Sequence, residues 1–137
     1  MTLRTIRVAV AMLTASGCAT LPEAESTRPS AATHLPVLSF KPDVMLTALA
    51  RGRLMVRAGC IRIVGKGGGD GMLVIWPAGS QLVTDNRRQI VVVGGSGRRL
   101  FVGSNVSLGG GGSDQFDPEA LTEPLPPTCS GPYFSGY

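Results

Sequence analysis

Apolar residues in this chain occur in short runs punctuated by glycine, a pattern that predicts strands joined by turns. Many of the runs are rich in β-branched residues, which favour strands over helices. Two pairs of runs flank glycine-rich segments and therefore predict hairpins: 60–64 with 72–76 across Lys66–Gly71, and 89–93 with 98–102 across Gly94–Gly97. Residues 72–76 and 90–93 are apolar at every position, so we expect both faces of those strands to be covered.

Three other stretches are less regular. Residues 42–51 fit either a short helix that ends before Gly52 or a strand. Apolar positions then change from even (Leu54, Val56) to odd (Ile61, Ile63), which predicts one strand interrupted by a bulge at Gly59. A further strand at 105–108 is expected to end where the run Gly109–Gly112 begins.

Five or six short strands at this spacing predict a mainly β domain. The architecture is expected to be a small barrel or a folded antiparallel sheet, with the five-stranded OB barrel as one option. The 19 glycines and 10 prolines among 137 residues agree with short strands and many turns. After Ser113 the sequence predicts a helical turn at Asp117–Leu121, followed by an extended prolyl segment that lies across the sheet.

The N-terminal residues have the pattern of an exported protein. Arg4 and Arg7 precede the apolar run Val8–Ala15, which is too short to span a bilayer as a helix. The segment Ala15-Ser16-Gly17-Cys18 resembles the lipobox of bacterial lipoproteins, although Ala15 stands where that family most often has Leu. The resemblance implies cleavage before Cys18 and acylation of that cysteine, for example with palmitate. Because Ala19, and not Asp, follows Cys18, the resemblance also implies an outer-membrane location facing the periplasm.

These observations divide the chain into three expected parts. They are a cleaved signal peptide at 1–17, a lipidated cysteine with a flexible tether at 18–36, and a small β domain with a Pro-rich tail at 37–137. The tether is rich in Pro, Ser, Thr and Ala and lacks apolar periodicity. As a flexible coil it would reach about 20–25 Å.

The cysteines fit an oxidising compartment. With Cys18 assigned to lipid, Cys60 and Cys129 are left as a pair, and we expect them to form a disulfide. That bridge would close a loop of about 70 residues and stabilise the fold by about 4 kcal/mol. A zinc site is disfavoured because neither cysteine belongs to a CxxC motif or lies near a histidine.

Few residues have the pattern of a catalytic or cofactor site. The one histidine, His34, lies in the expected tether, where it cannot be held beside a nucleophile. The glycine-rich segments match neither a dinucleotide-binding turn nor a P-loop. We therefore expect a protein that is not an enzyme and has no cofactor and no metal site. Loss of Arg4 and Arg7 would lower the net charge from +4 to +2, which is too weak to predict a nucleic-acid partner.

The motif Trp76-Pro77-Ala78-Gly79 is the most distinctive in the domain. Its tryptophan either closes one end of the core or forms a stacking platform for a sugar ring or a peptide. Tyr133 and Phe134 near the C-terminus either pack onto the barrel or join Trp76 as ligand contacts. Residues 54–130 resemble small exported bacterial domains for which no activity is established. We expect a binding or scaffolding module, anchored in the membrane by its lipid, with an envelope protein or a cell-wall glycan as partner.

Overall fold

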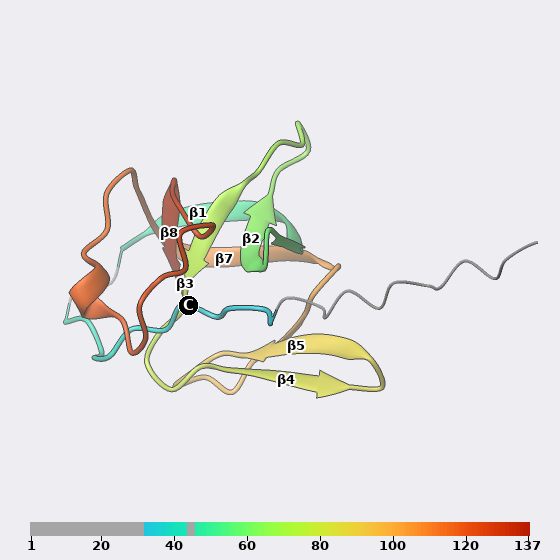
Figure 1. The fold of residues 1–137 in the computed structure, drawn as a ribbon, viewed down its shortest axis with the longest axis horizontal. Helices are drawn as coiled ribbons and strands as arrows, with labels where there is room; N and C mark the ends of the chain where they lie inside the picture. Colours follow the sequence, from blue (N-terminus) through green and yellow to red (C-terminus); the bar gives the residue numbers. More distant parts are fainter. Residues whose placement is uncertain (1–31, 44–45) are drawn as a thin grey trace, which may run out of the picture. The chain divides into compact units, whose positions relative to one another are not determined.

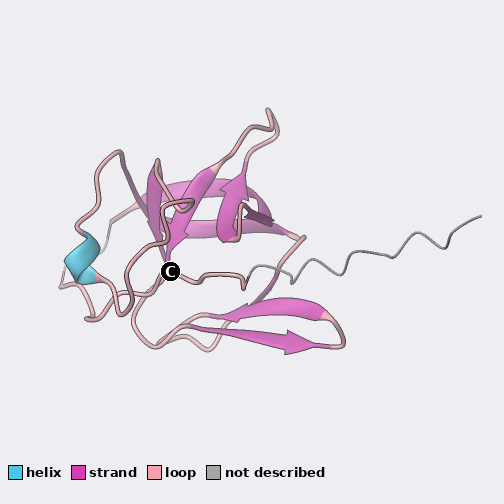
Figure 2. Ribbon diagram, viewed as in Figure 1, coloured by secondary structure: helices cyan, strands magenta, loops and turns pink. Residues whose placement is uncertain are grey.

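The fold is seen in a computed structural model, which describes residues 32–43 and 46–137. The expected signal peptide, Cys18 and most of the expected tether lie outside these residues. The described residues belong to one compact unit, Ala31–Tyr137. It is mainly β, as predicted, with strands and a single turn of 3-10 helix, η1, at Pro118–Ala120 (Figure 2). The strands are β1 (Ala48–Arg57), β2 (Cys60–Val64), β3 (Met72–Ile75), β4 (Gln81–Asp85), β5 (Arg88–Val92), β6 (Arg99–Phe101), β7 (Asn105–Ser113) and β8 (Tyr133–Gly136).

Five strands close into a barrel in the order β1-β2-β3-β8-β7, visible in the upper part of Figure 1. All neighbours are antiparallel except β3 and β8, which run parallel. This order with one parallel pair is that of the OB barrel, so the predicted small barrel is confirmed. The predicted hairpin across Lys66–Gly71 is present as β2 and β3.

A second sheet, β4-β5-β6, is inserted in the sequence between β3 and β7. The predicted hairpin across Gly94–Gly97 is present as β5 and β6. Strand β4 was not predicted, because its turn with β5 contains no glycine. Asn86 and Arg87 adopt positive φ values of 46° and 66° there, as a two-residue hairpin of the type I′ kind requires.

The predicted bulge at Gly59 is wrong, because the chain reverses at this point. Arg57 pairs with Cys60, and the residues between them, Ala58 and Gly59, have φ values of 50° and 78°. These values fit a type I′ hairpin turn. The change from even to odd apolar positions therefore marks the passage from β1 to β2, and both sets face the barrel interior.

The predicted strand end at Gly109 is also wrong, because β7 continues to Ser113. Its glycines allow close packing of other segments. A Cβ atom on Gly110 would overlap the Ser135 carbonyl oxygen of β8, and one on Gly111 would overlap the side chain of Leu46. Side chains at these positions would force β8 and Leu46 away from β7.

Two apolar clusters hold the domain together. The first fills the barrel and extends to the second sheet through Val91 of β5, Val93 just after β5 and Leu100 of β6. The second lies outside β2 and β3 and is covered by the C-terminal tail, so both faces of β3 are buried as expected. The predicted disulfide is present between Cys60 and Cys129, whose Cα atoms are 5.6 Å apart.

The domain begins before residue 37, because residues 33–38 are docked on it. The His34 amide donates to the Gly59 carbonyl (2.7 Å), the Trp76 amide to the Pro36 carbonyl (2.8 Å) and the Leu38 amide to the Trp76 carbonyl (2.9 Å). Gln89 of β5 donates to the Thr33 hydroxyl (2.8 Å). In Figure 1 this cyan segment passes between the barrel and the β4–β5 hairpin. The expected tether therefore ends at about Ala32.

Candidate functional site

Two of the three aromatic residues expected as ligand contacts are buried. Trp76 is 0% exposed and Phe134 is 3% exposed, and both belong to the barrel core. Neither ring can stack on a ligand in this conformation, so the stacking platform at Trp76 is ruled out and its core placement holds. Tyr133 is half-buried against the tail, with its ring 5.8 Å from that of Phe116.

Strand β1 instead carries a row of arginines on the outside of the barrel. Its burial alternates, with Ala50 and Leu54 inside and Arg51 and Arg53 exposed. On the neighbouring strand β7, Ser107 pairs with Arg51, and Asn105 pairs with Arg53. The two strands therefore present arginines and small polar side chains on one surface.

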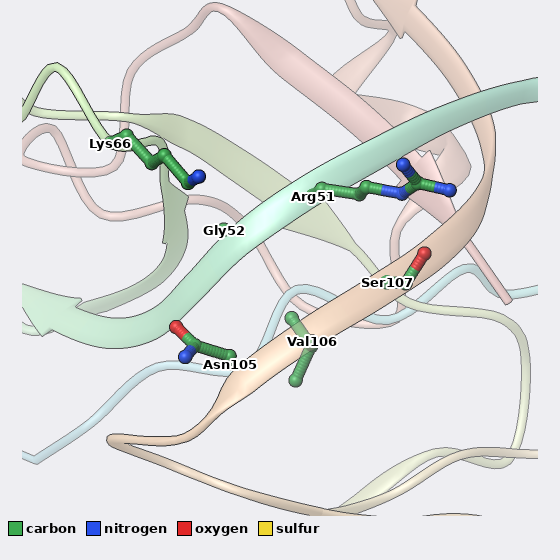
Figure 3. A pocket seen from close by; sticks show the side chains of 6 residues that line it. All are labelled: Arg51, Gly52, Lys66, Asn105, Val106 and Ser107. Carbon is green, nitrogen blue, oxygen red and sulfur yellow. The ribbon is translucent and has the colours of Figure 1, made fainter.

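Gly52 allows a further cation, Lys66, to lie at this surface. A Cβ atom at Gly52 would overlap the Val64 carbonyl oxygen, so only glycine allows the end of β2 to approach β1 this closely. The chain then passes through Gly65 to Lys66, whose side chain lies on the other side of Gly52 from Arg51 (Figure 3). Together these segments form a pocket of about 410 Å³, here called the basic pocket. Its lining residues are Arg51, Gly52, Lys66, Asn105, Val106 and Ser107.

Arg98 and Arg53 flank the basic pocket. Arg98 donates to the backbone carbonyl of Ser107 at 3.4 Å, and Arg53 donates to that of Gly103 at 2.6 Å. Within residues 32–43 and 46–137 the only ion pair closer than 4.0 Å joins Arg99 to Asp85, at 3.9 Å. The cations around the pocket are therefore not neutralised by carboxylates of the described chain.

This arrangement is suited to binding an anion. Guanidinium and ammonium groups donate charge-assisted hydrogen bonds to phosphate or carboxylate, while Asn105 and Ser107 supply neutral donors and acceptors. The volume is within the range of small-molecule sites, about 300–1,000 Å³. Among the described residues, no group of three or more His, Cys, Asp or Glu side chains is placed to hold a metal ion.

This site was not predicted from the sequence, because its cations come from separate segments. Arg51 lies in β1, Lys66 in the loop between β2 and β3, and Arg98 in the turn before β6. A search for consecutive basic residues finds only the pairs Arg87-Arg88 and Arg98-Arg99. One feature of the sequence could have indicated the site. Arg51, Arg53 and Arg57 all occupy odd positions, so in a strand they share one face, which in β1 is the outer face.

His34 also differs from its expected place in a solvated tether. Its backbone pairs with that of Cys60, and its Nε2 atom is buried without a hydrogen-bond partner in the described part of the chain. The ring lines a separate hollow with Ser80 and Thr122 and does not approach the basic pocket. His34 therefore belongs to the docked N-terminal segment and not to this site.

The chain matches no protein-family model, no curated protein and no solved structure. No helix in the described residues is both long enough and apolar enough to cross a bilayer.

Proposed function

We propose that this protein is a lipid-anchored, non-catalytic binding module of the bacterial cell envelope, and that its ligand is an anion held in the basic pocket. One observation carries the choice of ligand. Arg51 and Lys66 lie on either side of Gly52 and line one pocket with Asn105 and Ser107, and neither cation has a carboxylate partner among the described residues. Because exposed like charges repel one another, such a cluster favours an anionic ligand.

The proposed anchor is Cys18, on the basis of its lipobox. Since residues 33–38 are docked on the domain, the proposed tether would consist of the 14 residues Ala19–Ala32. As a flexible coil it would keep the domain about 20 Å from the bilayer, and fully extended about 50 Å. The protein would thus act close to the membrane that holds it, which we propose to be the outer membrane facing the periplasm.

A cell-wall glycan is the second candidate ligand. Asn105 and Ser107 provide neutral hydrogen-bonding groups next to the cations, a combination that suits a sugar carrying a carboxylate. This candidate uses the basic pocket and no longer depends on stacking at Trp76.

The anchor is tested by fractionating cells that produce the natural chain or its Cys18→Ser variant. The natural chain should remain with membranes after a high-salt wash and have a mass equal to residues 18–137 plus acyl chains. The variant should be released as soluble protein. Retention of Cys18→Ser on membranes after the salt wash would overturn the lipid anchor.

The ligand is tested by NMR titration of mature Cys18→Ser chain, residues 18–137, exported so that the disulfide forms without lipid. The probes are sn-glycerol 3-phosphate and N-acetylmuramic acid at millimolar concentrations, with neutral glycerol as the control. Shifts confined to the amides of residues 51–53, 66 and 105–107 would support an anionic ligand, and a response to the sugar acid alone would favour the glycan. Absence of a response to both anions would overturn the proposal.

A further inference from the structure

We propose that the outer face of β1 and β7 docks on an anionic phospholipid surface, with the cations of the basic pocket against the lipid phosphates. This inference rests on the proposed function and deepens it, because it identifies the anion as a lipid headgroup and gives the domain an orientation.

The row of outward residues on β1 changes from cationic to apolar along the strand. Arg53 and Arg51 are followed, toward the start of the strand, by Leu49, which is 55% exposed. Leu46, just before β1, is 49% exposed. These are two of the four exposed large apolar side chains in the described chain, and both continue the basic row.

The glycines of β7 project no side chains at this apolar end, so its apolar groups form one continuous surface. Leu49 pairs with Gly109, and a Cβ atom on Gly109 would lie 3.3 Å from the Tyr137 ring. Leu46 packs over Gly111, and the Tyr137 hydroxyl donates to the Leu46 carbonyl. No side chain of β7 stands between these groups. We call the whole surface the graded face: Arg51, Arg53, Lys66, Asn105 and Ser107 at its basic end, and Leu46, Leu49 and Tyr137 at its apolar end.

A surface of this composition complements an anionic bilayer. Cations near such a bilayer are attracted by its negative surface potential, while leucine and tyrosine side chains gain by entering the interfacial region. A soluble sugar acid would account for the cations but not for the exposed leucines that continue their row. The proposed tether would also raise the effective concentration of the graded face near the headgroups.

The test is flotation of the mature Cys18→Ser chain, residues 18–137, with vesicles. One set is pure phosphatidylcholine, and the other is an equimolar mixture of phosphatidylcholine and phosphatidylglycerol. We expect binding to the mixed vesicles only, weakening as salt is raised. Arg51→Ala and Lys66→Ala should each reduce the partition coefficient about fivefold, because each cation near the surface contributes about that factor.

Matched variants distinguish binding through the graded face from nonspecific binding by other exposed side chains. Arg88→Ala removes an exposed cation on β5, and Phe101→Ser removes an exposed apolar side chain on β6. Neither should change flotation by more than experimental error, whereas Leu49→Ser should reduce it. Equal losses with the control variants, or equal binding to both kinds of vesicle, would overturn the docking proposal.

Failure of docking is distinguishable from failure of the proposed function. If the glycerol phosphate titration shifts the pocket amides while mixed vesicles are not bound, the anion site stands and docking on lipid is overturned. If the mixed vesicles, sn-glycerol 3-phosphate and N-acetylmuramic acid all fail to bind, both proposals are overturned.

Discussion

The guanidinium of Arg62 donates a hydrogen bond to the Ser130 carbonyl oxygen at 2.6 Å, next to the disulfide between Cys60 and Cys129. A second bond reaches the Gly71 carbonyl at 3.3 Å, and Arg62 is only 5% exposed. The C-terminal tail is therefore attached to β2 twice, once covalently and once through a buried cation.

Arg62→Ala should lower the free energy of unfolding by about 2–3 kcal/mol, since it removes charge-assisted hydrogen bonds and leaves a buried carbonyl without its donor. Urea denaturation of the oxidised protein measures this. Arg57→Ala, an exposed position on β1, should cost less than about 0.5 kcal/mol. Equal costs for the two variants would show that Arg62 does not hold the tail.

Gly52→Ala should destabilise the protein by about 1–3 kcal/mol, because the added methyl group would meet backbone atoms of Val64 that cannot move without shifting β2. Gly67 offers a matched control in the neighbouring loop, where a Cβ atom has nothing within 4 Å. The melting temperature should fall for Gly52→Ala and stay close to the natural value for Gly67→Ala. A similar small change in both would contradict the close approach of β2 to β1.

Ala58→Asn should stabilise the protein by about 0.5–1 kcal/mol. Ala58 has a φ of 50°, which an alanine adopts at a cost, and asparagine before Gly59 creates the dipeptide preferred in type I′ turns. Ala58→Val should have the opposite effect, because β-branched residues strongly resist positive φ. Chemical denaturation of both variants tests the hairpin, and a stabilising valine would be incompatible with it.

Trp76 is the one tryptophan in the chain, so fluorescence reports directly on its burial. Its emission should be blue-shifted and poorly quenched by acrylamide in the native state. Trp76→Ala should cost about 3–5 kcal/mol of stability. Because the Nε1 atom has no hydrogen-bond partner in the described residues, Trp76→Phe should cost clearly less. Ready quenching in the folded protein would contradict the core position.

Features with local signals were predictable from the sequence. The hairpins around Lys66–Gly71 and Gly94–Gly97 were predictable because glycine lies between two apolar runs in each. The disulfide was predictable because Cys60 and Cys129 are the two cysteines of the expected domain. Strand β8 was missed because its parallel partner β3 is distant in the sequence, and Tyr133–Gly136 read only as a terminal aromatic segment. The basic pocket could not be predicted for the same reason, since only the tertiary structure places Arg51, Lys66 and Arg98 on one surface.

The place of β8 in the barrel has a consequence for biogenesis. Strand β8 fills the gap between β3 and β7, both of which are synthesised before it. Until Gly136 has been made, the barrel lacks one wall and both neighbours have unpaired edges. Complete folding of this domain is therefore postponed until β8 has been synthesised. The strand order itself thus makes closure of the barrel the last step that becomes possible as these strands are synthesised.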